Sequence, residues 1–182
     1  MPKGRPAKRS VVEVATNVIP LETDAQIAAK LKERFEILDL LTEATINGDA
    51  RSVVVSGPAG LGKSYSIEKG LNNWDPNEVN HTIVKGFVRA TGLYKLFYSH
   101  RSKGQVLVFD DADSIFFDDV CLNLLKAVCD TTERRMVSWM AESRLTDDDT
   151  GLVIPNRFEF NGTIIFITNI DFDAQIEKIG RA

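Results

Sequence analysis

Four short, uninterrupted apolar runs constrain the fold of this chain more than any other feature. Runs of this length without polar alternation are typical of strands that are buried on both faces of a sheet. Helical patterns separate them at residues 63–71, 90–100 and 121–128. This alternation predicts an α/β protein whose parallel sheet is covered by helices on both sides. The four runs are residues 52–56, 81–84, 105–109 and 163–168.

A long helix is predicted before the first of these strands. Thr23 and Gln26 form a capping-box pattern, and Asn47-Gly48 is a typical helix end. Between them, apolar residues recur at spacings of three and four, which predicts one amphipathic helix over residues 23–46. The apolar residues are Ile27, Leu31, Phe35, Leu38 and Leu41.

One segment interrupts the alternation before the fourth strand. Residues 135–140 and 152–160 are strand-like, and an acidic, glycine-ended stretch at 146–151 separates them. We interpret this segment as an inserted β-hairpin or extended excursion. Pro155 predicts that its second arm is an edge.

Composition limits the chain to ordinary globular classes. It has 182 residues, 43% hydrophobic and 26% charged, which fits one domain comprising residues 21–182. No apolar run approaches the roughly 18 residues needed to span a bilayer, so no membrane partner is predicted. Two cysteines and two histidines are scattered, which argues against a zinc site and favours a reducing, cytoplasmic location.

The net charge of −4 is unevenly distributed. The first ten residues carry four bases and no acid, and subtracting them leaves 18 basic against 26 acidic side chains. Bulk charge therefore does not make the body a nucleic-acid-binding surface. Residues 1–20 are predicted to be a basic, flexible tail, either solvated or in contact with nucleic acid.

A glycine-rich octapeptide, GPAGLGKS, links the first strand to the next helix. It fits the pattern G-x-x-x-x-G-K-[ST], whose glycines let backbone N–H groups converge on phosphate oxygens. The helix N-terminus adds its positive dipole end. Lys63 can reach the β- and γ-phosphates, and the Ser64 hydroxyl can ligate Mg²⁺. The predicted phosphate-binding residues are Gly57, Pro58, Ala59, Gly60, Leu61, Gly62, Lys63, Ser64 and Tyr65.

Two carboxylates follow the third strand. Parallel strands end at the same edge of a sheet, so Asp110 and Asp111 are predicted beside the glycine loop. Asp110 is assigned to the metal, and Asp111 to the attacking water. The alternative is that these acids only start a helix, as Asp118 and Asp119 do.

The fourth strand ends in Thr168-Asn169. If this strand lies between the first and third, the Asn169 amide points into the cleft beside the γ-phosphate. There it could hold the attacking water. The alternative is an ordinary asparagine that starts a turn.

Three segments resemble, in chain order, the Walker A, Walker B and sensor-1 motifs of the AAA+ ATPases. They are GPAGLGKS, VLVFDDADSIF and GTIIFITNID. The resemblance implies a P-loop NTPase fold of three layers, with sheet order 5-1-4-3-2. It implies that Lys63 and Ser64 bind phosphate and Mg²⁺, that Asp110 binds the metal, and that Asp111 and Asn169 are base and sensor. It also implies a homo-oligomeric ring, usually hexameric, with ATP between subunits.

The chain departs from the family pattern in two respects. The second acid is usually Glu, whereas here it is Asp111; a pair of aspartates does occur in viral superfamily III helicases. No fifth strand, helical lid or sensor-2 arginine is recognised, so the sequence is interpreted as a core that stops before the lid.

Two further roles rest on the resemblance. Arg181 is the candidate arginine finger, with Arg157 and Arg135 as rivals, and each could instead be a surface arginine. Phe87 lies where protein-threading members carry an aromatic pore residue. The alternative is a core residue, because phenylalanine is more often buried.

The leading hypothesis is an ATP-hydrolysing enzyme that uses ATP and Mg²⁺ to remodel or move a macromolecule. The basic tail and the excursion slightly favour nucleic acid over protein, and a virus-encoded member is compatible with this. The alternatives are a small-molecule P-loop kinase and a nucleotide-binding scaffold that does not hydrolyse ATP.

Overall fold

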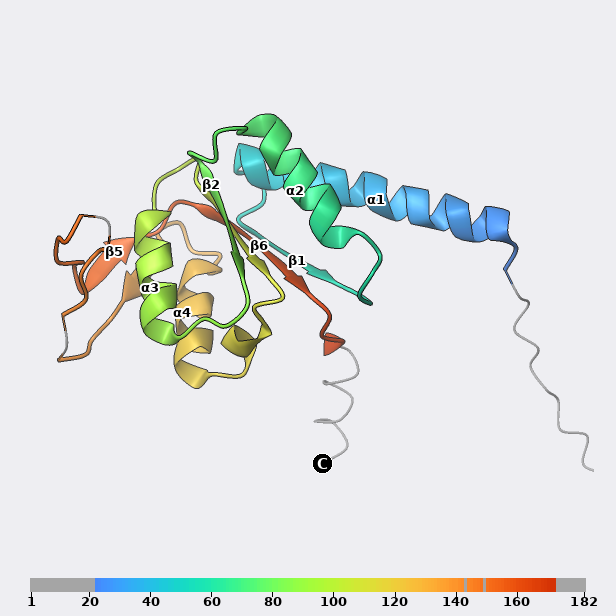
Figure 1. The fold of residues 1–182 in the computed structure, drawn as a ribbon. Helices are drawn as coiled ribbons and strands as arrows, with labels where there is room; N and C mark the ends of the chain where they lie inside the picture. Colours follow the sequence, from blue (N-terminus) through green and yellow to red (C-terminus); the bar gives the residue numbers. More distant parts are fainter. Residues whose placement is uncertain (1–21, 143, 149, 173–182) are drawn as a thin grey trace, which may run out of the picture.

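The structure is a computed structural model that describes residues 22–142, 144–148 and 150–172 (Figure 1). The predicted tail at 1–20 and the candidate Arg181 lie outside these residues. The helices are α1 (Asp24–Asn47), α2 (Lys63–Trp74), α3 (Ala90–Ser99), the 3₁₀ helix η1 (Asp113–Phe116) and α4 (Asp119–Val128). The strands are β1 (Ser52–Ser56), β2 (His81–Lys85), β3 (Val106–Asp110), β4 (Met136–Ser138), β5 (Arg157–Glu159) and β6 (Thr163–Thr168).

The main sheet contains the four predicted strands, and all of them are parallel. Its order is β1-β6-β3-β2, so β6, the last strand in the described chain, lies between β1 and β3. The carboxyl ends of all four strands meet at one edge of the sheet. This edge carries the glycine loop and the residues that follow β3 and β6.

Alternate residues of β3 show why the fold has three layers. Val106 and Val108 pack with Leu38 of α1 and with α2, whereas Leu107 and Phe109 pack with α3 and α4. All five residues of β3 are buried. Because successive side chains of a strand point to opposite faces, an unbroken apolar run can supply both cores at once.

Helix α1 begins and ends as its sequence predicts, but its apolar stripe is only partly used. Thr23 and Gln26 form the capping box, and Gly48 ends the helix with a left-handed φ of 82°. The helix extends beyond the sheet (Figure 1), and Leu38 is buried while Ile27 is exposed. The amphipathic pattern therefore predicts the helix correctly but overstates how much of it is buried.

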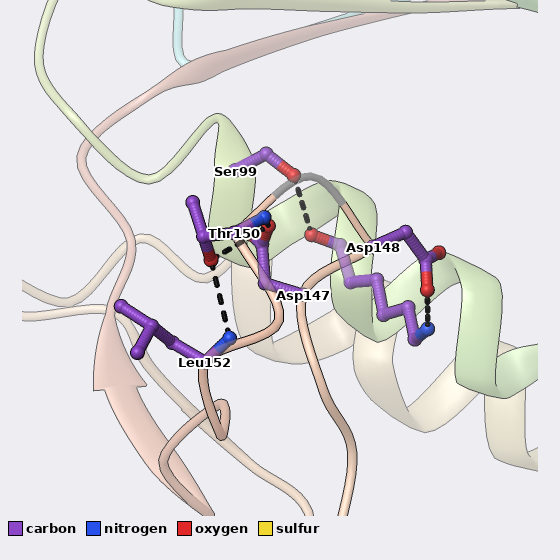
Figure 2. Close-up of polar contacts among 6 residues, drawn as sticks. Ser99, Asp147, Asp148, Thr150 and Leu152 are labelled. Carbon is purple, nitrogen blue, oxygen red and sulfur yellow. Dashed lines mark hydrogen bonds and ion pairs between the residues drawn. The ribbon is translucent and has the colours of Figure 1, made fainter.

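The segment before β6 contains a second, two-stranded antiparallel sheet formed by β4 and β5. Between these strands, the Asp147 carboxylate accepts hydrogen bonds from the backbone N–H and hydroxyl of Thr150 (Figure 2). Asp148 pairs with Lys95 of α3, so the acidic turn is held against the body of the protein. A local turn thus explains Asp147, and one ion pair explains Asp148.

Arg135, next to β4, is buried at the opposite edge of the sheet from the glycine loop. Its guanidinium donates to the carbonyl oxygens of Val128 at 2.9 Å and Gly162 at 2.8 Å, and it lies over the Phe160 ring. The guanidinium therefore joins the end of α4 to the turn before β6. Because Arg135 is buried and bonded to backbone carbonyls of its own chain, it does not fit the role of an arginine finger, and that prediction is wrong.

Within the described residues, none of the helices combines the length and apolar character that crossing a membrane requires.

Candidate nucleotide site

The glycine loop lies between β1 and α2, as the sequence predicts. Gly60 and Gly62 have φ angles of 81° and 84°, in the left-handed region that glycine enters without steric cost. Gly62 is the N-cap of α2, and no side chain caps this helix end. The backbone N–H groups of the first turn of α2 are therefore free of intrahelical bonds and suit an anion.

The Lys63 side chain folds back onto the glycine loop that precedes it. Its ammonium donates to the carbonyl oxygens of Gly57 at 2.7 Å and Pro58 at 2.8 Å, and to Asn169 Oδ1 at 3.1 Å. All three acceptors are neutral, so among the described residues no acid is paired with the positive charge of Lys63. A phosphate group would offer the ammonium stronger, charged acceptors.

The two predicted metal ligands are adjacent. Ser64 Oγ donates to Asp110 Oδ1 at 2.8 Å, which brings a hydroxyl oxygen from α2 beside a carboxylate from β3. Hard oxygen donors of this kind fit Mg²⁺, which usually takes one or two protein ligands besides phosphate and water. Among the residues the structure describes, no cluster of three acidic, histidine or cysteine side chains forms a separate metal cage.

Asn169 joins the loop to the second carboxylate. Its Nδ2 donates to Asp111 Oδ1 at 2.9 Å, while its Oδ1 accepts from Lys63. Asp111 has a φ of 53°, which is uncommon for a residue other than glycine and is often found at functional sites. Both residues line a cavity of about 300 Å³ with residues 59–65 and Ile167. The structure thus brings the predicted base and sensor together.

Two supporting contacts were not predicted. Thr168 Oγ1 donates to Asp113 Oδ1 at 2.6 Å, and Ser56 Oγ donates to the carbonyl of Ile170 at 2.6 Å. Asp113 is the first residue of η1, and its carboxylate ties η1 to the end of β6. Both contacts join strand ends that are far apart in the sequence.

Lys85 is a further charged residue at the site that the sequence analysis missed. Its ammonium lies 3.4 Å from Asp110 Oδ2 and 3.6 Å from Glu68 Oε2. The hydrogen bond to Asp110, with the charge of Glu68, raises the pKa of Lys85 above its usual value. The sequence signal that could have identified Lys85 is its position at the end of β2, beside a strand that ends in Asp110.

Of the residues assigned by resemblance, Arg157 lies in the separate sheet of β4 and β5. Phe87, which follows β2, is 75% exposed, and the Arg89 guanidinium lies 6.0 Å from its ring centre. The core interpretation of Phe87 is therefore wrong.

A larger groove of about 790 Å³ lies between α1 and α2. It is lined by Gly62 and Tyr65 of the loop region, but not by Lys63, Asp111 or Asn169. The groove is therefore distinct from the cavity that contains the convergent polar groups.

No family model matches the chain. It is 37% identical over 158 residues to an uncharacterised 36.7 kDa protein of Enterobacteria phage T4, encoded in the nrdC–mobD intergenic region. The match covers 86% of this chain and 47% of the relative, so the chain spans about half the length of that phage protein.

Among solved structures, the chain is similar to NtrX from Brucella abortus, which was determined in complex with ATP. The TM-score is 0.41 at 15% identity, and the match covers 88% of this chain and 39% of NtrX.

Proposed function

We propose that this chain binds ATP with Mg²⁺ in the cavity beside the glycine loop and hydrolyses it. The observation that carries the proposal is the contact series Lys63–Asn169–Asp111, which links a phosphate-binding lysine to a carboxylate across the cavity. Ser64 and Asp110 supply the adjacent oxygen donors for the metal. A glycine turn with no ligand would not require these five polar side chains to converge.

Each residue has a defined role in this proposal. The first-turn N–H groups of α2 and the ammonium of Lys63 hold the phosphates, and Ser64 and Asp110 hold Mg²⁺. When bound, Mg²⁺ supplies positive charge to the β- and γ-phosphate oxygens. Asp111 accepts a proton from the attacking water at a carboxylate oxygen, and the Asn169 amide orients both the water and Asp111.

The proposed work of the enzyme is to remodel or move a macromolecule, with nucleic acid slightly favoured over protein. The basic residues in the first ten positions and the β4–β5 excursion support this preference. The exposed Phe87 with Arg89 over its ring supports contact with a large partner near the end of β2. An aromatic face beside a cation suits bases as well as peptide side chains.

We also propose that the protein forms a ring in which Arg181 of one subunit completes the site of the next. Within the described residues β1 is an edge strand that pairs only with β6. This position leaves one side of β1 open to a fifth strand. Val54 of β1 is 53% exposed. A further strand beside β1 would give the order 5-1-4-3-2.

The proposal is tested by Mg²⁺-dependent release of phosphate from ATP over a series of protein concentrations. Wild type is expected to hydrolyse ATP without an added acceptor, with specific activity rising as subunits associate. Lys63→Ala and Asp111→Asn should abolish release, whereas Asp119→Asn, an exposed aspartate at the start of α4, should not. Stimulation by added DNA or RNA would identify the class of substrate.

Three results would contradict parts of this proposal. Phosphate transfer that requires a small-molecule acceptor would indicate a kinase. ATP binding with equally low turnover in wild type and Asp111→Asn would indicate a nucleotide-binding scaffold. The absence of any ATP binding would exclude the nucleotide site itself.

A further inference from the structure

Lys85 occupies an unusual position for a cation, because it lies beside a proposed metal ligand. It pairs in register with Asp110, since β2 and β3 are parallel neighbours. The Lys85 side chain is 58% exposed and reaches from the rim, whereas the Asp110 side chain is 7% exposed. The ammonium therefore covers the accessible side of a nearly buried carboxylate.

The two oxygens of Asp110 have different partners. Oδ1 accepts the hydrogen bond from Ser64, and Oδ2 faces the ammonium of Lys85 at 3.4 Å. A dication held by Ser64 and Asp110 would meet this ammonium at close range, and like charges repel strongly where water is partly excluded. Metal binding therefore requires Lys85 to leave Asp110 or to give up part of that contact.

Glu68 offers Lys85 a second position. It lies four residues after Ser64 in α2, one turn further along the same helix face. Its Oε2 is already 3.6 Å from the Lys85 ammonium, and the Glu68 side chain is 46% exposed. A flexible lysine stem can thus shift its charge from one acid to the other by a small rotation.

We propose that Lys85 competes with Mg²⁺ for Asp110, and that Glu68 takes up the displaced ammonium. This inference rests on the proposed function and adds to it a control over metal affinity. In the metal-free protein Lys85 neutralises the charge of Asp110. In the metal-bound protein Glu68 neutralises the charge of Lys85, so Lys85 has an acidic partner in both states.

The test measures binding of a fluorescent ATP analogue during a Mg²⁺ titration that starts in EDTA. Lys85→Met is expected to lower the Mg²⁺ concentration at half-saturation by about 3- to 10-fold, the size of a typical coupling between sites. Glu68→Gln is expected to raise it by about 2- to 5-fold, because Lys85 then has only Asp110 as an acid partner. The double variant should behave like Lys85→Met, since Glu68 acts through Lys85.

Lys69→Met is the matched control. Lys69 is an exposed lysine next to Glu68 in the sequence, and its removal changes the net charge by the same amount. This variant should leave the Mg²⁺ half-saturation unchanged. Circular dichroism of each variant verifies folding before the titration.

The outcomes separate this inference from the proposed function. If wild type binds the analogue but Lys85→Met leaves the Mg²⁺ half-saturation unchanged, the competition is excluded and the nucleotide site stands. Weaker analogue binding by Lys85→Met in EDTA, with no change in Mg²⁺ half-saturation, would instead make Lys85 a phosphate ligand. If wild type does not bind the analogue with or without Mg²⁺, the proposed function fails, and the inference fails with it.

Discussion

Asn169 at the end of β6 donates a hydrogen bond to Asp111 after β3, with Nδ2 and Oδ1 2.9 Å apart. The two residues are 58 positions apart in the sequence. They meet because β6 and β3 are parallel neighbours whose carboxyl ends lie at the same edge. The other end of the amide accepts from Lys63, so one side chain contacts both the glycine loop and the second carboxylate.

Removal of this amide should affect turnover more than binding. Asn169→Ala is expected to reduce the rate of ATP hydrolysis by about 10- to 100-fold, because Asp111 and the water lose their common orienting group. Nucleotide affinity should stay within about threefold, since the loop and Lys63 remain. Steady-state phosphate release and analogue binding measure the two effects. Asn161→Ala, an exposed asparagine before β6, is the control, and equal turnover in both variants would refute the role of Asn169.

Gly162, in the turn before β6, should tolerate no side chain. A Cβ there would lie inside the contact distance of the His100 carbonyl oxygen and 3.1 Å from the carbonyl oxygen of Gln105. Gly162→Ala is expected to lower the free energy of unfolding by at least about 2 kcal/mol, because backbone atoms have to move. Urea denaturation measures this loss.

Gly92→Ala is the matched control for Gly162→Ala. Gly92 lies inside α3, and the nearest atom to an added Cβ there is Val88 Cγ1 at 3.9 Å. This substitution should stabilise the protein by about 0.5–1 kcal/mol, because alanine favours the helix. Similar unfolding free energies for the two variants would contradict the predicted clash.

Arg135 is expected to act in stability rather than in catalysis. Arg135→Met should lower the free energy of unfolding by about 2–4 kcal/mol, because the carbonyls of Val128 and Gly162 lose a buried, charged donor. Arg134→Met removes an exposed arginine that pairs with Glu159, and it should cost less than about 1 kcal/mol. Hydrolysis per folded molecule should be equal in both variants. Selective loss of activity in a stable Arg135→Met protein would restore the arginine-finger hypothesis.

His100 should make stability fall in mild acid. Burial lowers its pKa below the ordinary value of 6.5, and Nε2 lies 2.9 Å from Thr82 Oγ1. Below pH 6.5 the unfolded chain therefore binds a proton more readily than the folded protein, so stability decreases as the pH falls through this range. His100→Gln removes this titration and should give a shallower decline between pH 7.5 and about pH 5 in urea denaturation. An unchanged slope would show that other groups cause the decline.

Much of the fold follows from local patterns in the sequence. The four apolar runs predict the strands of the main sheet, since a run without polar alternation can be buried only between two layers. Thr23, Gln26 and Gly48 predict the ends of α1 because caps depend on neighbouring backbone groups. The glycine loop and the two acids at the end of β3 reach one edge because parallel strands end together.

Only the tertiary structure decided which distant groups touch. The contacts of Lys85 with Asp110, Thr168 with Asp113 and Arg135 with Gly162 depend on strand order and on how far each side chain reaches. Helical periodicity likewise could not show that Ile27 is exposed, because burial depends on where the sheet ends. Sequence patterns report interactions a few residues apart, whereas burial and charge pairing are settled by whichever elements the fold places side by side.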